Sequence, residues 1–107
     1  MPLAAIGVVV DDLDRARDFY RLLGIAIAED PEGHGHAEAE LAGGMRLMFD
    51  TVETMRSFDA EWARSSGSPP VTLAFSMDSP AEVDAKHAEL VAAGGQSHKE
   101  PWDAFWG

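Results

Sequence analysis

The spacing of hydrophobic positions predicts a strand and then a helix at the start of the chain. Residues 3–10 are rich in β-branched residues, and their larger side chains alternate with smaller ones. The larger set is Ile6, Val8 and Val10, and the smaller set is Ala5, Gly7 and Val9. We expect the larger set to face a core. Asp12 is placed to cap a helix whose apolar positions recur every three or four residues until Gly24.

Three short strands are expected to complete this first segment. They cover residues 25–29, 36–41 and 45–50, with turns at residues 30–33 and 43–44. Polar and apolar side chains alternate strictly in the middle strand, which is typical of a strand with one solvated face. The next segment has a weaker pattern, in which Val52, Met55, Phe58 and Trp62 suit either a short helix or a packed loop. The Ser- and Pro-rich residues 65–70 predict a linker.

The pattern then restarts. Residues 71–77 alternate like the first strand, and Ser79, Pro80 and Glu82 form the start signal of a second helix that ends at Gly94. Residues 3–50 and 71–107 therefore form two copies of one pattern, joined by a linker at residues 51–70, and the second copy is shorter by eleven residues. Three of the last six residues are aromatic. Either these rings pack on a partner chain or cleft, or the sequence stops before its last strands, and we favour the second explanation.

Composition narrows the possible classes of function. The chain has 107 residues and no cysteine, which excludes a disulfide scaffold, a thiol nucleophile and cysteine-based metal sites. Its net charge of −11 disfavours nucleic acid and anionic membranes as partners. The first apolar run is too short to span a bilayer. A signal peptide begins with basic residues, whereas the first basic residue of this chain is Arg15. We therefore expect a cytoplasmic protein.

The motifs resemble those of a known superfamily. Residues 8–16 read VVVDDLDRA and are followed by Phe-Tyr at 19–20 and Leu-Gly at 23–24. The second copy has Ala-Phe at 74–75, DSPAEVD at 78–84, AAGG at 92–95, KEPW at 99–102 and FWG at 105–107. These features are similar to the glyoxalase / bleomycin-resistance / extradiol-dioxygenase group, the vicinal oxygen chelate superfamily, over nearly the whole chain.

The resemblance implies an α+β fold of paired βαβββ modules, whose curled mixed sheet surrounds a cleft. Residues 1–107 then form one domain, and its second module is incomplete at the C-terminus. Members of the group usually work as dimers and sometimes exchange modules, so a homodimer is expected. Because one scaffold serves many activities, the resemblance is more specific for fold than for chemistry.

The metalloenzymes of this group hold a divalent ion with His and Glu side chains, and the resemblance maps their ligand positions onto this chain. The first falls at Ala5, the second at Arg46 or Leu47, and the third at Thr72, while the fourth lies beyond Gly107. None of the visible positions holds a metal-binding side chain, so we expect no metal or other cofactor. The alternative is one divalent ion at His36 and Glu38, which share a strand face. Alternating polar residues are also what a solvated strand face requires.

A ligand cleft is expected instead, because small side chains on the two inner strands leave room. The expected ligand-binding residues are Arg46, Met48, Asp50, Trp62, Thr72, Trp102 and Trp106. The tryptophans are suited to stack on a planar ligand, although core or dimer contacts would explain them equally well. Arg46 is expected to pair either with a ligand anion or with Asp50 or Glu38.

These residues predict a metal-independent protein that sequesters a small molecule, as bleomycin-resistance proteins do. The acidic surface favours a planar or cationic guest. The alternative is a divalent-metal-dependent enzyme of the glyoxalase or dioxygenase kind, in which metal would polarise substrate oxygens and a carboxylate would move a proton. A third possibility is a subunit that only dimerises.

Overall fold

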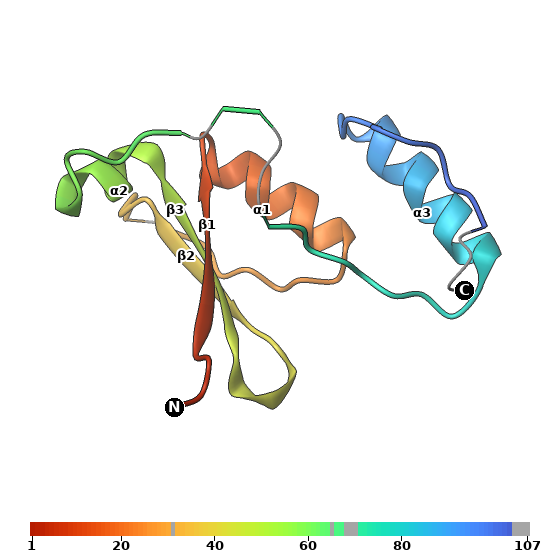
Figure 1. Ribbon diagram of the computed structural model, residues 1–107, viewed down its shortest axis with the longest axis horizontal. Helices are drawn as coiled ribbons and strands as arrows, with labels where there is room; N and C mark the ends of the chain where they lie inside the picture. The colour runs from red at the N-terminus through yellow and green to blue at the C-terminus, as the bar shows by residue number, and fades with distance from the viewer. Residues whose placement is uncertain (31, 65, 68–70, 104–107) are drawn as a thin grey trace. The chain divides into compact units, whose positions relative to one another are not determined.

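The computed structural model describes residues 1–30, 32–64, 66–67 and 71–103 (Figure 1). Its elements are β1 (Ala5–Val10), α1 (Leu13–Leu22), β2 (His36–Glu40), a 3-10 turn (Ala42–Gly44), β3 (Arg46–Thr51), α2 (Val52–Phe58) and α3 (Pro80–Ala92). The chain divides into two compact units, Met1–Pro70 and Val71–Gly107, which are described separately. None of the helices in the described segments is long and apolar enough to cross a bilayer.

The first unit contains a three-stranded mixed sheet in the order β1-β3-β2. β1 runs parallel to β3, with Ala5 opposite Arg46, whereas β2 runs antiparallel to β3, with His36 opposite Asp50. The predicted hairpin turn between β2 and β3 is confirmed, and the Leu41 N–H donates to the Met45 carbonyl at 2.7 Å. The sheet is too small to curl around a cleft by itself, so the expected curl is absent from this unit.

The core of the first unit lies between one face of this sheet and α1. Its buried hydrophobic residues are Leu13, Ile27, Ala37, Ala39, Leu47 and Phe49. Phe49, on the central strand, is fully buried, and its ring lies 4.9 Å from that of Tyr20 on α1. Ile6 and Val8 pair with Leu47 and Phe49 in register, which confirms that the larger side chains of β1 face the core.

Helix α1 begins and ends where the sequence predicts. The Asp12 carboxylate accepts a hydrogen bond from the Arg15 N–H at 3.1 Å and so caps the first turn. At the other end Gly24 has a φ of +82°, the left-handed conformation that glycine adopts without a steric penalty.

The predicted strand at residues 25–29 is wrong. Ile27 is buried, but its N–H donates to the Ile25 carbonyl at 3.2 Å, which bends the segment. Two arginines of α1 hydrogen-bond to backbone carbonyls that strand pairing would need. Arg17 Nε donates to the Ala28 carbonyl, and Arg21 Nη2 donates to the Ile27 carbonyl. One long bond of 3.5 Å, from the Ala28 N–H to the Glu38 carbonyl, joins the segment to β2. The first module is therefore βαββ rather than βαβββ.

Helix α2 lies inside the segment expected to be a linker, and it is the short helix that the apolar spacing allowed. The Thr51 hydroxyl caps it by accepting from the Thr54 N–H at 3.2 Å. The Ser- and Pro-rich linker falls mostly outside the described residues, as does Pro31 of the predicted turn. The Gly33 N–H still donates to the Asp30 carbonyl at 3.1 Å, as that turn requires.

The second unit contains α3, and its start signal is confirmed. The Ser79 hydroxyl accepts from the Glu82 N–H at 3.2 Å, and Pro80 occupies the first turn. The predicted strand at residues 71–77 is wrong, since this segment has no regular secondary structure. A strand needs a neighbour to accept its hydrogen bonds, and the described part of this unit contains no other strand.

Candidate functional site

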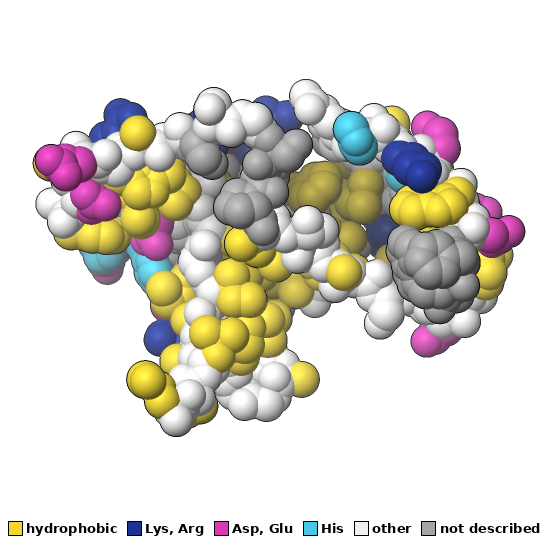
Figure 2. All heavy atoms as spheres, in the orientation of Figure 1, with side chains coloured by type: hydrophobic (Ala, Val, Ile, Leu, Met, Phe, Trp, Pro, Cys, Tyr) yellow, Lys and Arg dark blue, Asp and Glu magenta, His cyan; other side chains and the backbone are white. Residues whose placement is uncertain are grey.

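The face of the sheet opposite α1 carries most of the polar side chains of β2 and β3. The strand register places three sets of neighbouring positions across this open face: Ala5–Arg46–Glu40, Gly7–Met48–Glu38 and Val9–Asp50–His36. Arg46, Met48 and Asp50 therefore share a face, as their spacing predicts. Along β1 the surface is apolar, and Figure 2 shows hydrophobic side chains gathered over this strand.

His36 is held between two carboxylates on this open face. Its Nδ1 lies 2.6 Å from Asp50 Oδ1, and its Nε2 lies 2.9 Å from Glu38 Oε2. The Asp50 side chain is the more buried partner, with 13% of its surface exposed against 38% for Glu38. Both ring nitrogens face acceptors, which favours the doubly protonated imidazolium. The hydrogen bonds to Glu38 and Asp50 accordingly raise the pKa of His36 above its usual value.

Arg46 extends this cluster across the sheet. Its guanidinium donates to the second oxygen of Glu38 at 3.0 Å, so Glu38 is bonded both by His36 on its own strand and by Arg46 on β3. Hydrogen bonds from His36 and Arg46 lower the pKa of the Glu38 carboxyl. Of the partners expected for Arg46, the structure selects Glu38. We call Asp50, His36, Glu38 and Arg46 the charged row.

The charged row predicts a pH-dependent contribution to stability. Because the folded pKa of His36 is raised, its contribution is full below the ordinary pKa of about 6.5 and is lost as pH rises through the raised pKa. The free energy of unfolding should therefore fall by at most about 1 kcal/mol over this rise in pH, since these groups are partly solvated. We expect His36→Gln to abolish this fall. Urea unfolding between roughly pH 5 and 9 tests this, and parallel pH curves for both proteins would contradict it.

The residues of the open face do not fit a metal site of the kind the resemblance implies. Leu47 is buried in the core, so the second ligand position is Arg46, and the register sets it opposite Ala5. A methyl group and a guanidinium offer a metal no lone pair. The alternative site also fits poorly, because both nitrogens of His36 are engaged by carboxylates. Within the described residues, no group of three or more potential ligands is arranged to hold a metal ion.

The other predicted ligand residues do not belong to the strands of this sheet. Trp62 lines a separate hollow. Thr72 and Trp102 belong to the second unit, where both are exposed and Lys99 Nζ lies 3.8 Å from the centre of the Trp102 ring. Trp106 lies outside the described residues.

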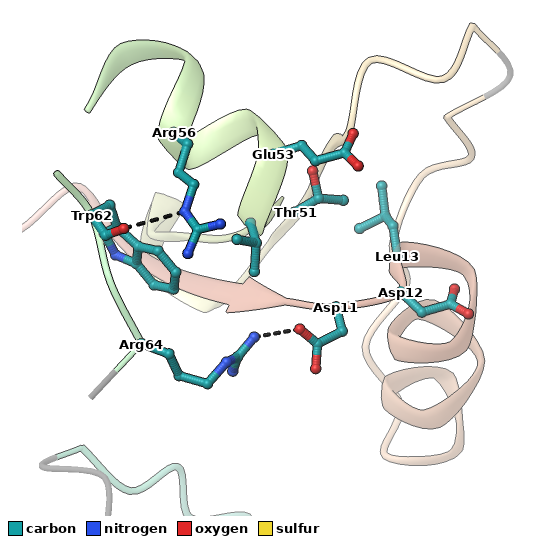
Figure 3. A pocket seen from close by; sticks show the side chains of 9 residues that line it. Asp11, Asp12, Leu13, Thr51, Glu53, Arg56, Trp62 and Arg64 are labelled. Atoms are coloured by element: carbon teal, nitrogen blue, oxygen red, sulfur yellow. Dashed lines mark hydrogen bonds and ion pairs between the residues drawn. The ribbon is translucent and has the colours of Figure 1, made fainter. Parts of the chain in front are cut away.

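The hollow lies where the parallel strands β1 and β3 end (Figure 3). Its volume is about 670 Å³, and its lining residues are Asp11, Asp12, Leu13, Thr51, Val52, Glu53, Arg56, Trp62 and Arg64. Arg64 forms an ion pair with Asp11, and Arg56 Nε donates to the Trp62 carbonyl at 3.3 Å. Of these lining residues, the sequence analysis predicted only Trp62 to bind a ligand. The available signal was that Asp11 directly follows β1 and Thr51 ends β3, at the end of the parallel pair where ligand sites often form.

Comparison with known proteins gives one family. The model of the Glyoxalase/Bleomycin resistance protein/Dioxygenase superfamily matches residues 3–107. A search of the curated proteins finds no match to this chain.

Solved structures resemble the whole chain. A glyoxalase/bleomycin resistance protein/dioxygenase family enzyme from Burkholderia phytofirmans PsJN is 20% identical, with a TM-score of 0.80 over 99% of this chain and 84% of that one. A glyoxalase/bleomycin resistance protein/dioxygenase from Nocardioides is 24% identical, with a TM-score of 0.69 over 99% of this chain and 70% of that one. A glyoxalase-related enzyme from Fulvimarina pelagi is 27% identical, with a TM-score of 0.69 over 89% of this chain and 66% of that one. The chain thus spans about two thirds or more of each.

Proposed function

Because this chain belongs to the glyoxalase/bleomycin resistance protein/dioxygenase superfamily, we propose that it binds a small planar or cationic molecule, without a metal, on the open face of its sheet. The observation that carries the proposal is the pairing of Ala5 with Arg46. These are the neighbouring positions at which metalloenzymes of the group hold their ion, and neither side chain is a ligand. The protein acts by stoichiometric capture as a homodimer, and no bond is made or broken.

The charged row supplies the recognition of a cation. Glu38 and Asp50 flank His36 on one face of the sheet, and Glu40 adds a third carboxylate on that face. Arg46 offsets one of these charges through its bond to Glu38. A cationic guest gains most where the carboxylates are not already neutralised.

We therefore expect the affinity for a cation to rise with pH. Deprotonation of His36 above its raised pKa removes one positive charge from the face, so Asp50 and Glu38 are less neutralised. A Coulomb estimate at an exposed site gives about three- to tenfold tighter binding of a monocation. Isothermal titration with proflavine between roughly pH 6 and 9 measures this change, and His36→Gln should abolish it. An affinity that falls as pH rises would contradict the proposed role.

A binding panel tests the proposed function itself. We expect metal-free bleomycin or proflavine to bind with one molecule per site, and Asp50→Asn to weaken the binding about tenfold. Glu61→Gln is the matched control, because it removes the same charge from an exposed residue outside the sheet. Failure of every planar or cationic compound to bind would overturn the proposal.

The second candidate is a metal-dependent glyoxalase- or dioxygenase-like enzyme. The observation in its favour is the imidazole of His36 flanked by two carboxylates, a set of groups capable of proton transfer. Native mass spectrometry after dialysis against zinc, manganese and nickel separates the candidates. A dimer without metal is the result expected here, whereas one ion per chain would favour the enzyme.

A further inference from the structure

The hollow beyond β1 and β3 is separate from the open face and is built only from the unit Met1–Pro70. Its volume of about 670 Å³ lies within the range of small-molecule sites. No group in it contributes to the charged row. Its chemistry therefore needs its own explanation.

Two opposite charges line the hollow without neutralising each other. Glu53 and Arg56 stand three residues apart on α2, the spacing at which such charges often pair. In the described part of the chain neither forms an ion pair, and in Figure 3 the Glu53 carboxylate points away from Arg56. Other charges in the hollow are committed: Arg64 pairs with Asp11, and Asp12 caps α1.

An aromatic surface lies next to the free end of Arg56. The Trp62 N–H donates to the Asp59 carbonyl at 3.0 Å, and the Trp62 carbonyl accepts from Arg56 Nε at 3.3 Å. These bonds fix the backbone that carries the half-buried indole. They also occupy Nε of Arg56 and leave its two terminal nitrogens, which can donate two parallel hydrogen bonds to a carboxylate.

We propose that this hollow binds a small zwitterion that carries a flat ring, of the aromatic amino acid class. Arg56 receives the carboxylate, Glu53 the ammonium group, and the Trp62 indole the ring. A simple anion is disfavoured because the chain carries a net charge of −11. A simple cation would leave Arg56 without a partner. A zwitterion satisfies both charges without changing the net charge.

Three probes that share one ring test the proposal. L-phenylalanine carries both charges, 3-phenylpropanoate lacks the ammonium group, and 2-phenylethylamine lacks the carboxylate. Titrations followed by ¹⁵N–¹H NMR should show L-phenylalanine binding at least about tenfold more tightly than either analogue. Shifts should centre on the residues of the hollow. Equal affinity for all three, or no binding up to about 20 mM, would overturn the proposal.

Variants identify the groups responsible. We expect Arg56→Met and Glu53→Gln each to weaken the binding of L-phenylalanine at least about tenfold, and Trp62→Leu to weaken it several-fold. Both charged residues are exposed, so these variants should stay folded, with NMR shifts confined to the residues next to each substitution. Arg15→Met and Glu61→Gln are the matched controls on exposed surface outside the hollow. An unchanged affinity in Arg56→Met would refute the assignment.

The result is independent of the proposed function. Proflavine binding is assigned to the open face and L-phenylalanine binding to the hollow. Each is measured with its own probe, so one proposal can fail while the other stands. Competition between the two probes for one site would overturn the inference that the hollow is a separate site.

Discussion

Replacing Phe49 with alanine is expected to lower the free energy of unfolding by about 3–5 kcal/mol. Phe49 is fully buried at the centre of the sheet and packs on the Tyr20 ring of α1. Truncation leaves a cavity between sheet and helix that neither element can close alone. Since domains of this size are stable by roughly 5–15 kcal/mol, this one change removes a large part of the total. Urea unfolding followed by far-UV circular dichroism measures the difference.

Phe58 provides the control for this experiment. It is the same residue type at the end of α2, with 70% of its surface exposed. Phe58→Ala should change the free energy of unfolding by no more than about 0.5 kcal/mol. Equal losses in the two variants would mean that the core is not centred on β3.

A methyl group at Gly35 is expected to cost about 2–4 kcal/mol. Gly35 has a φ of +73°, which is strained for any residue with a Cβ. The new Cβ would also collide with the Thr54 hydroxyl and lie 2.9 Å from that of Thr51. These hydroxyls bond each other at 2.9 Å, and Thr54 also donates to the Gly35 carbonyl at 3.0 Å. Thermal and urea unfolding of Gly35→Ala measure the loss.

Gly43→Ala separates the two causes. Gly43 has a φ of +80°, but an added Cβ would meet no atom within 4 Å. This variant should therefore cost only the backbone strain, about 1–2 kcal/mol. If Gly35→Ala costs no more than Gly43→Ala, the hydroxyl cluster yields without penalty and the packing argument fails.

The elements that the sequence predicts correctly have their causes nearby in the chain. Asp12 and Ser79 each meet an N–H three residues on, so the start of each long helix is a local event. The alternation in β2 indicates a strand with one solvated face. Its polar residues lie on that face, and Ala37 and Ala39, which alternate with them, are buried.

The two wrong strands fail for reasons that arise away from their own residues. At 25–29 the apolar pattern is satisfied by burial of Ile27, but arginines from α1 bind the carbonyls. At 71–77 the alternation is ideal, yet a ladder requires a neighbouring strand, which the described part of that unit lacks. Hydrophobic spacing predicts which side chains are buried and not which groups bind the backbone.

The candidate site shows the same division. Spacing placed Arg46, Met48 and Asp50 on one face, because side-chain direction alternates along a strand. The contact between His36 and Asp50 depends on the register of β2 against β3, which a hairpin turn sets and spacing alone does not. Trp62 and Arg56 meet through a loop after α2, and no periodic pattern reports such a contact.

The parallel pairing of β1 with β3 also constrains how the protein folds. The β2–β3 hairpin joins residues close in sequence, whereas Ala5 and its partner Arg46 are forty-one positions apart. Closing the longer loop costs more chain entropy, so the hairpin and α1 should form before β1 adds to the edge of β3. On the ribosome β1 emerges first and waits, with its apolar residues unpaired, until Thr51 has left the exit tunnel. The first strand made is thus the last to join the sheet.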